Sequence, residues 1–222
     1  MPSFFSSDIQ GVVYKLLISL IISLIALPIH EYAHGYAAYR QGRLTLNPLV
    51  HIDPLGTLAL ILFGFGWAKP VQINPLNFEN PKKGMMLSAL AGPLSNVGLA
   101  FISMVFYKLS YIPVYMGMSG AFIMTVQTFL LYMISINITL AVFNFIPIPP
   151  FDGSRIATYF LPQRIYFKIM QYENIIFIGL LVILWLGFLD GPISFVSTSV
   201  TGILDFITRP IDWLTAILAA RF

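Results

Sequence analysis

The stretch Leu16–His34, LLISLIISLIALPIHEYAH, is an apolar run of membrane-spanning character that ends in a His-Glu-x-x-His pattern. On an α-helix, residues four positions apart lie on one face, so the imidazoles of His30 and His34 can bind a single metal ion. Glu31 lies about 100° further round the helix, where it can act on a metal-bound water without being a ligand. The pattern therefore predicts a zinc site on a membrane helix.

The alternative is a helix that carries two histidines on a polar stripe, for instance along a proton path. The chain has three histidines and three glutamates. At that composition the pattern would arise by chance in on the order of 5 in 10,000 such chains, which favours the metal site. Because the chain has no cysteine, zinc would have to be held by histidines and carboxylates.

The composition is that of an integral membrane protein. Of the 222 residues, 58% are hydrophobic and 9% are charged, with a mean hydropathy of +0.83. A soluble globule needs more polar surface than this. The net charge of +3 is small and spread between apolar stretches, which argues against nucleic-acid binding. We expect one integral membrane domain over 1–222, with a catalytic core at about 12–161 and C-terminal helices at about 174–222.

Hydropathy predicts an all-α polytopic bundle of about four or five spans, or six if a re-entrant segment is counted. The expected spans lie at about 12–39, 85–107, 121–146 and 174–189. In the second of them, Ser88, Gly92, Asn96 and Ala100 recur every four residues and predict close helix packing. The last stretch, at about 193–222, is interrupted by polar residues, and we expect it to form a packed or interfacial helix.

Between the first two spans, four turn-forming dipeptides exclude a continuous helix: Asn47-Pro48, Asp53-Pro54, Asn74-Pro75 and Asn80-Pro81. The apolar stretch Leu55–Trp67 is short for a span, and we interpret it as a re-entrant or interfacial segment. A small β-hairpin is expected next to it. The expected edge strand of this hairpin consists of Trp67, Ala68, Lys69, Val71 and Ile73. This strand could pair with an unwound peptide; the alternative is an ordinary surface hairpin without that role.

Basic residues predict the orientation in the membrane. They cluster between Arg40 and Lys83 and again after the third span, whereas the loop between the second and third spans holds Lys108 alone. The positive-inside rule places both basic regions in the cytoplasm and the N-terminus outside. The first span then ends inside with its two histidines, and the third span ends inside shortly before Asp152. The topology therefore brings His-Glu-x-x-His and Asp152 to the same depth.

Zinc held by two histidines of one helix usually takes a third protein ligand and leaves one position for water. The candidates are Asp152, Glu79 and His51. The sequence favours Asp152, because Pro147–Pro150 ends the third span and places this carboxylate on stiff, extended backbone at the membrane edge. Its alternative role is that of an N-cap for a helix that starts at Gly153.

A zinc-bound water beside a glutamate is an apparatus for hydrolysis. Glu31 would take the proton of the water and pass it to the leaving amine. Asn96 and Asn144 lie in otherwise apolar spans, and either could donate to the developing oxyanion or form a hydrogen bond between helices.

Together these residues resemble the site-2 proteases, a family of intramembrane zinc metalloproteases. The resemblance rests on His30-Glu31-x-x-His34, on Gly92-x-x-x-Asn96, and on Asn144-x-x-Pro147-x-Pro149-x-x-Asp152-Gly153. His51–Gly56 and Gly66–Pro70 are similar to the compact prokaryotic members that lack a PDZ domain. Phe151 departs from the family pattern, which usually has leucine before Asp-Gly, and this affects the expected pocket shape rather than metal binding.

The resemblance implies that His30, His34 and Asp152 hold one Zn²⁺ per chain and that Glu31 is the catalytic base. The substrate would be the transmembrane segment of another protein, cut during regulated intramembrane proteolysis or membrane-segment clearance. The protein would be multi-pass in a prokaryotic plasma membrane, with its active site toward the cytoplasm. Two alternatives are a metal or proton transporter, in which Glu31 has no clear role, and a catalytically inactive scaffold, against which the intact motif argues.

Overall fold

The computed structural model describes residues 9–40, 78–118 and 120–220, and the regular elements in these ranges are all α-helices. Four long helices form the body of the molecule: α1 (Ile9–Arg40), α3 (Pro81–Leu109), α5 (Ala121–Asn144) and α9 (Asp190–Ala219). Four shorter helices complete the described part of the chain: α4 (Tyr111–Tyr115), α6 (Asp152–Phe160), α7 (Gln163–Gln171) and α8 (Glu173–Trp185). The predicted all-α membrane bundle is confirmed.

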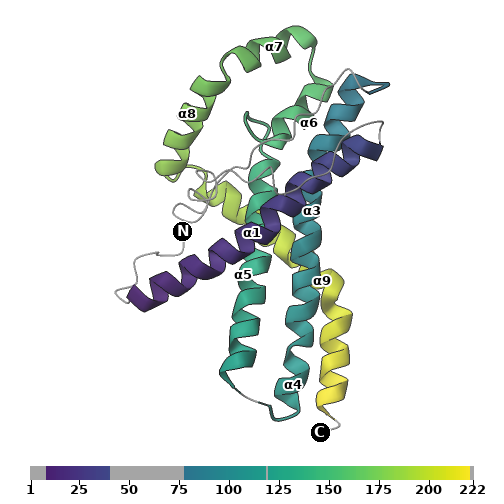
Figure 1. Ribbon diagram of the computed structural model, residues 1–222, viewed down its shortest axis with the longest axis vertical. Helices are drawn as coiled ribbons and strands as arrows, with labels where there is room; N and C mark the ends of the chain where they lie inside the picture. Colours follow the sequence, from purple (N-terminus) through teal and green to yellow (C-terminus); the bar gives the residue numbers. More distant parts are fainter. Residues whose placement is uncertain (1–8, 41–77, 119, 221–222) are drawn as a thin grey trace.

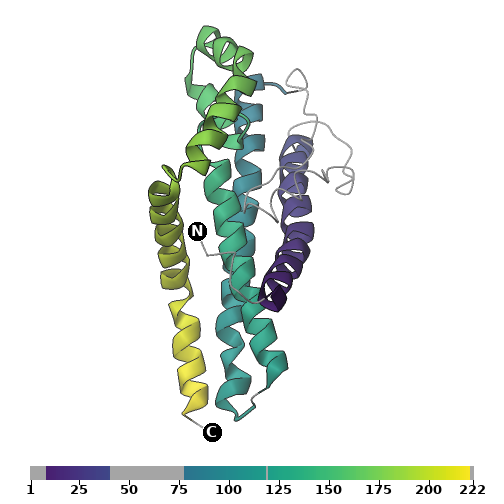
Figure 2. The ribbon, with the colours of Figure 1, turned by 90° about the vertical axis from the view of Figure 1, so that its left-hand side faces the viewer.

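Helices α3 and α5 pack along one another at the centre of the bundle (Figure 1). Helix α1 crosses this pair obliquely on one side, and α9 lies along it on the other (Figure 2). The core between α3, α5 and α9 consists of Ala100, Met104, Ile134, Ile138, Val142 and Leu204. Many large apolar side chains of α1, α8 and α9 are exposed, which suits outer faces that meet lipid instead of water.

By length and hydropathy, three described segments can each cross a membrane: Val13–Arg40, Pro81–Tyr115 and Ala121–Asn144. Helices α8 and α9 pass the same test together and meet at 84°, so the described residues contain three spans, or four if this bent pair is one span. The fourth span expected at 174–189 extends further than the helix found there, because α8 ends at Trp185 after 13 residues. Gly187, at φ +76°, turns the chain there, and the N–H groups of Gly187 and Phe188 donate to carbonyls of α8.

The predicted turn at Asn80-Pro81 is the start of α3. Asn80 is the N-cap and accepts a hydrogen bond of 3.2 Å from the Lys83 N–H, while Pro81 occupies the first helical position. The expected re-entrant segment Leu55–Trp67, the expected edge strand at 67–73 and His51 all lie outside the described residues.

The proline-rich connector ends α5, as predicted, but most of it is built of turns and bends, with hydrogen bonds from the Ile148 N–H to the Ile146 carbonyl (2.8 Å) and from the Phe151 N–H to the Ile148 carbonyl (3.1 Å). The backbone is extended at Phe151 (φ −69°, ψ 155°), directly before Asp152. Prolines fix their own φ angle but leave ψ free to turn. The turns lead into α6, which packs against α3 and so returns Asp152 to the bundle.

Lys108, in the last turn of α3, attaches α9 to the bundle. Its Nζ lies 2.5 Å from Asp212 Oδ2 and 2.9 Å from Asp205 Oδ1, and it also donates to the Asp205 carbonyl at 3.3 Å. The lysine side chain is buried, whereas both carboxylates are about half exposed. A buried ammonium needs such partners because removing it from solvent is costly. The C-terminal helix is therefore packed on α3, as the sequence indicated.

We predict that the double substitution Asp205→Asn and Asp212→Asn destabilises the protein more than Lys108→Met does. The double variant leaves a buried ammonium without anionic partners. Its free energy of unfolding should fall by at most about 3–5 kcal/mol, the cost of removing one member of a buried ion pair. Lys108→Met removes the buried charge and leaves two carboxylates in contact with solvent. Thermal unfolding of the detergent-solubilised variants, followed by tryptophan fluorescence, tests the order. If Lys108→Met were the less stable of the two, the idea that Lys108 holds α9 on α3 through Asp205 and Asp212 would be wrong.

Candidate metal centre

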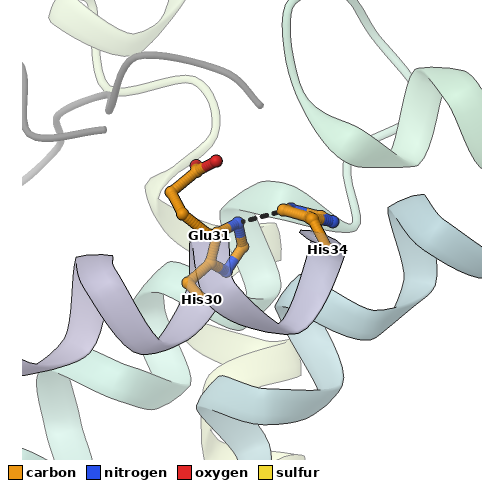
Figure 3. A group of neighbouring side chains, drawn as sticks. All are labelled: His30, Glu31 and His34. Carbon is orange, nitrogen blue, oxygen red and sulfur yellow. Dashed lines mark hydrogen bonds between the residues drawn. The ribbon is translucent and has the colours of Figure 1, made fainter. Parts of the chain in front are cut away.

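The two histidines of α1 converge inside the bundle. His30 Nε2 and His34 Nε2 lie 3.0 Å apart, both residues are buried, and the rings meet edge to face (Figure 3). They are one helical turn apart on a helix that continues unbroken through Pro28. The shared face predicted from the His-x-x-x-His spacing is therefore present.

Asp152 brings a carboxylate to the same point from a different part of the chain. Its Oδ2 lies 3.1 Å from Nε2 of His30 and 3.1 Å from Nε2 of His34. Asp152 is the first residue of α6, and the N-cap position belongs to Phe151, so the carboxylate does not cap the helix.

The three atoms form a nearly equilateral triangle with edges of 3.0, 3.1 and 3.1 Å. Ligand atoms about 2.05 Å from a tetrahedral zinc ion lie about 3.3 Å from one another, so the triangle has to widen only slightly. His34 Nδ1 lies 2.7 Å from the Ser88 carbonyl oxygen, which can only accept, so Nδ1 carries the proton and Nε2 of the neutral ring presents a lone pair. Two imidazoles and a carboxylate are a donor set that fits zinc.

Glu31 lies beside the histidine pair and is also buried. One of its carboxylate oxygens lies within 4.8 Å of a ring nitrogen of each histidine. In Figure 3 its side chain extends past His30 and does not enter the space between the two rings. It is therefore close enough to act on a molecule held at the histidines while leaving their Nε2 atoms to Asp152.

The remaining candidates lie elsewhere. Glu79 is exposed in the turn before α3, as a solvated charge would be. Asn144 is the last residue of α5 and is partly buried, and its side chain has no hydrogen-bond partner among the described residues. Phe151, the departure from the family pattern, packs its ring 6.1 Å from that of Phe143.

Three residues of α3 spaced one turn apart pack against the two imidazoles: Ser88, Gly92 and Asn96. Ser88 contacts His34 twice, because its carbonyl accepts from Nδ1–H and its hydroxyl donates to the His34 carbonyl at 3.0 Å. The amide nitrogen of Asn96 lies 3.1 Å from His30 Nδ1. Between them, a Cβ at Gly92 would lie 2.6 Å from His30 Cε1 and closer still to His34 Nε2. Glycine is therefore required at this position for α3 to approach the metal-binding face.

The sequence indicated close packing for this stripe but not its contact with the histidines. The overlooked signal was the spacing, because the stripe and the His-x-x-x-His pair repeat at the same interval of four residues. When two packed helices both carry such residues at every fourth position, successive turns of one helix can face successive turns of the other.

Comparison with known proteins identifies the family of this chain. The model of peptidase family M50 matches residues 16–186. The chain belongs to peptidase family M50. This is the site-2 protease family, so the resemblance found in the motifs is confirmed, and this M50 protein is a zinc-dependent metallopeptidase with membrane-spanning helices.

Curated relatives of this M50 protein carry matching names. It is 41% identical over 177 residues to YwhC of Bacillus subtilis strain 168, a zinc metalloprotease by name, which covers 76% of this chain and 78% of the relative. A protein of Methanocaldococcus jannaschii with the same kind of name is 32% identical over 149 residues, which covers 61% of this chain and 69% of the relative. No solved structure matches the chain at a significant level.

We predict that Gly92→Ala weakens zinc binding by this M50 protein by about 10-fold or more, the size of effect expected when the support of a ligand is disturbed. The added methyl group must displace an imidazole or separate α1 from α3. Gly98→Ala is a matched control on the same helix, because a Cβ there meets nothing within 4 Å. Zinc bound after equal exposure to a chelator, measured by mass spectrometry, compares the two. Equal zinc retention would contradict the close approach.

Proposed function

We propose that this protein is an intramembrane zinc metalloprotease that hydrolyses peptide bonds in or near the transmembrane segments of other membrane proteins. The observation that carries the proposal is the convergence of His30 Nε2, His34 Nε2 and Asp152 Oδ2 beside Glu31, within a bundle of membrane-spanning helices. We assign His30, His34 and Asp152 as the ligands of one Zn²⁺ per chain, and Glu31 as the catalytic base.

The depth of the site supports a substrate that lies in the membrane. Gly92, which backs both imidazoles, follows Pro81 by eleven positions of continuous helix, or about 16 Å at the rise of an α-helix. Lys82 and Lys83, at the start of α3, are exposed, and we place them at the membrane surface. A site at that depth lies within the hydrocarbon of the membrane and suits a peptide bond of a membrane segment.

The role proposed for each group follows from the position of its side chain. Bound zinc supplies a Lewis acid that lowers the pKa of a water and polarises the scissile carbonyl. Glu31, which is buried and not enclosed between the imidazoles, takes the proton of the attacking water and delivers it to the leaving amine. Asn144 and Asn96 are our two candidates for a donor to the carbonyl oxygen as it gains charge.

We place the active site toward the cytoplasmic side of a prokaryotic plasma membrane. The helix ends near the site are basic: Arg40 ends α1, and Lys82 and Lys83 begin α3. Arg155, Arg164 and Lys168 lie on α6 and α7 at the same end of the bundle (Figure 1). Lys108, near the opposite end, is neutralised by Asp205 and Asp212. This asymmetry follows the positive-inside rule.

We treat residues 1–222 as one protease domain, with a catalytic core at about 12–161 and C-terminal helices at about 174–222. The contact between Lys108 of α3 and the two aspartates of α9 supports this, because it joins the C-terminal helices to the helix that backs the metal centre.

We further propose that Trp67, Ala68, Lys69, Val71 and Ile73, outside the described residues, form an edge strand that holds the unwound substrate. A helical substrate keeps its peptide groups in its own hydrogen bonds and must unwind before attack. Backbone pairing with an edge strand would replace the hydrogen bonds that unwinding breaks.

Val71→Pro should therefore lower the cleavage of a helical membrane substrate more than that of an already extended peptide. Proline removes one backbone donor, and the loss of one hydrogen bond worth about 1 kcal/mol corresponds to roughly a fivefold loss in rate. Val71→Thr, which keeps the N–H and the β-branch, is the control. Cleavage rates of both substrates by each variant test the idea, and equal losses on both would refute the pairing strand.

Glu31→Gln should keep its zinc and lose about 10²- to 10⁴-fold in cleavage rate, the usual contribution of a general base. Zinc content and cleavage of a single-span model substrate are measured side by side for the native chain and the variant. Cleavage that persists in the variant would refute the role of Glu31. Zinc in both without cleavage by either would favour the scaffold or transporter alternatives, and metal transport would then be assayed in vesicles.

A further inference from the structure

Asn96 is fully buried on α3, one turn beyond Gly92, and its side chain faces His30. In the orientation described, amide nitrogen Nδ2 lies 3.1 Å from His30 Nδ1, and amide oxygen Oδ1 has no hydrogen-bond partner among the described residues. The two ends of an asparagine amide have the same shape, so the orientation has to be decided from the chemistry of the partners.

The two orientations have opposite consequences for His30. If the amide N–H donates to Nδ1, the neutral ring must carry its proton on Nε2, the atom that faces His34 Nε2 and Asp152 Oδ2. Such a ring cannot bind zinc through Nε2. If the amide is reversed, Oδ1 accepts from Nδ1–H and Nε2 presents a lone pair to the metal position. In either orientation one amide atom lacks a partner among the described residues, so the role of His30 decides between them.

The arrangement at His34 provides a precedent within the same site. There the Ser88 carbonyl oxygen, which can only accept, fixes the proton on Nδ1 and leaves Nε2 free. We propose that Asn96 is the equivalent positioning residue for His30, with its side-chain oxygen accepting from Nδ1–H. Helix α3 then supplies one oxygen acceptor to each imidazole, on either side of Gly92. This inference rests on the proposed function, because it takes both rings as zinc ligands.

This role differs from that of an oxyanion donor, which would use the N–H groups of Asn96. Two substitutions separate them. Asn96→Asp keeps an oxygen acceptor and removes the donors, and it should retain native zinc affinity. Asn96→Leu removes both at similar volume, and it should weaken zinc binding by about 10- to 100-fold, as the loss of a partner behind a ligand usually does.

Asn137→Leu is the matched control. Asn137 is also fully buried, lies on the neighbouring helix α5, and likewise has an Oδ1 without a described partner, but its Nδ2 donates to the Met133 carbonyl of its own helix. It should bind zinc like the native chain. A general effect of removing a buried amide would appear in both leucine variants, whereas support of His30 affects only the one at position 96.

Zinc affinity is measured on the full-length chain in detergent by competition with a chelator, and the absorption spectrum of the Co²⁺-substituted protein reports the ligand field. Thermal unfolding of the metal-free variants establishes that each is folded. Native affinity in Asn96→Leu, or equal losses in the aspartate and leucine variants, would overturn the assignment. Failure of the proposed function is a separate result, in which the native chain binds no zinc or His34→Ala loses none.

Discussion

The close approach of α1 and α3 at Gly92 is the contact on which the rest of the site depends. A side chain at that position would occupy the space of both imidazoles. With glycine there, α3 reaches the histidines with one polar residue on each side, Ser88 one turn before and Asn96 one turn after. Packing distance and ligand orientation are therefore fixed by the same stripe of residues. In an apolar bundle, where helices gain little from excluding lipid, small residues and interhelical hydrogen bonds provide that association.

Two clusters of polar side chains lie along α3, one in its N-terminal half and the other in its last turn. One cluster joins α1, α3 and α6 through the histidines, Asp152, Ser88 and Asn96. The other joins α3 to α9 through Lys108 and its two aspartates. In each, a buried ionisable group meets partners from another helix, as the cost of leaving it unpaired requires. Helix α3 is the common member, so it determines the position of both the metal centre and the C-terminal helix.

The sequence was sufficient to predict that His30, His34 and Asp152 converge, because their positions are governed by short-range periodicity and by topology. The interval between His30 and His34 determines a shared helix face, and the alternation of spans brings the start of α6 to their depth. Hydropathy also located the first three spans, although the second begins four residues earlier than expected, at Pro81, where Asn80 caps the helix. The partner of Lys108 could not be predicted, because Asp205 and Asp212 lie about a hundred positions away on a helix whose docking depends on tertiary contacts. Nor could the role of Ser88, which acts on His34 through a backbone carbonyl that every residue possesses.

Two carboxylates reach the histidines by different routes: Glu31 is buried and local to them, whereas Asp152, with a side chain 15% exposed, comes from a distant part of the chain. Glu31 follows His30 directly, so its side chain leaves α1 about 100° away from the face that the histidines share. From there it approaches the pair without entering the space between the Nε2 atoms. Asp152 comes from another helix, opposite that face, and reaches both Nε2 atoms equally. In the mechanism proposed above, the ligand must face both imidazoles and the base must remain free to exchange protons, so one carboxylate could not fill both roles. Glu31 and Asp152 carry the same functional group, so the difference between their proposed roles comes from the direction in which each side chain enters the site.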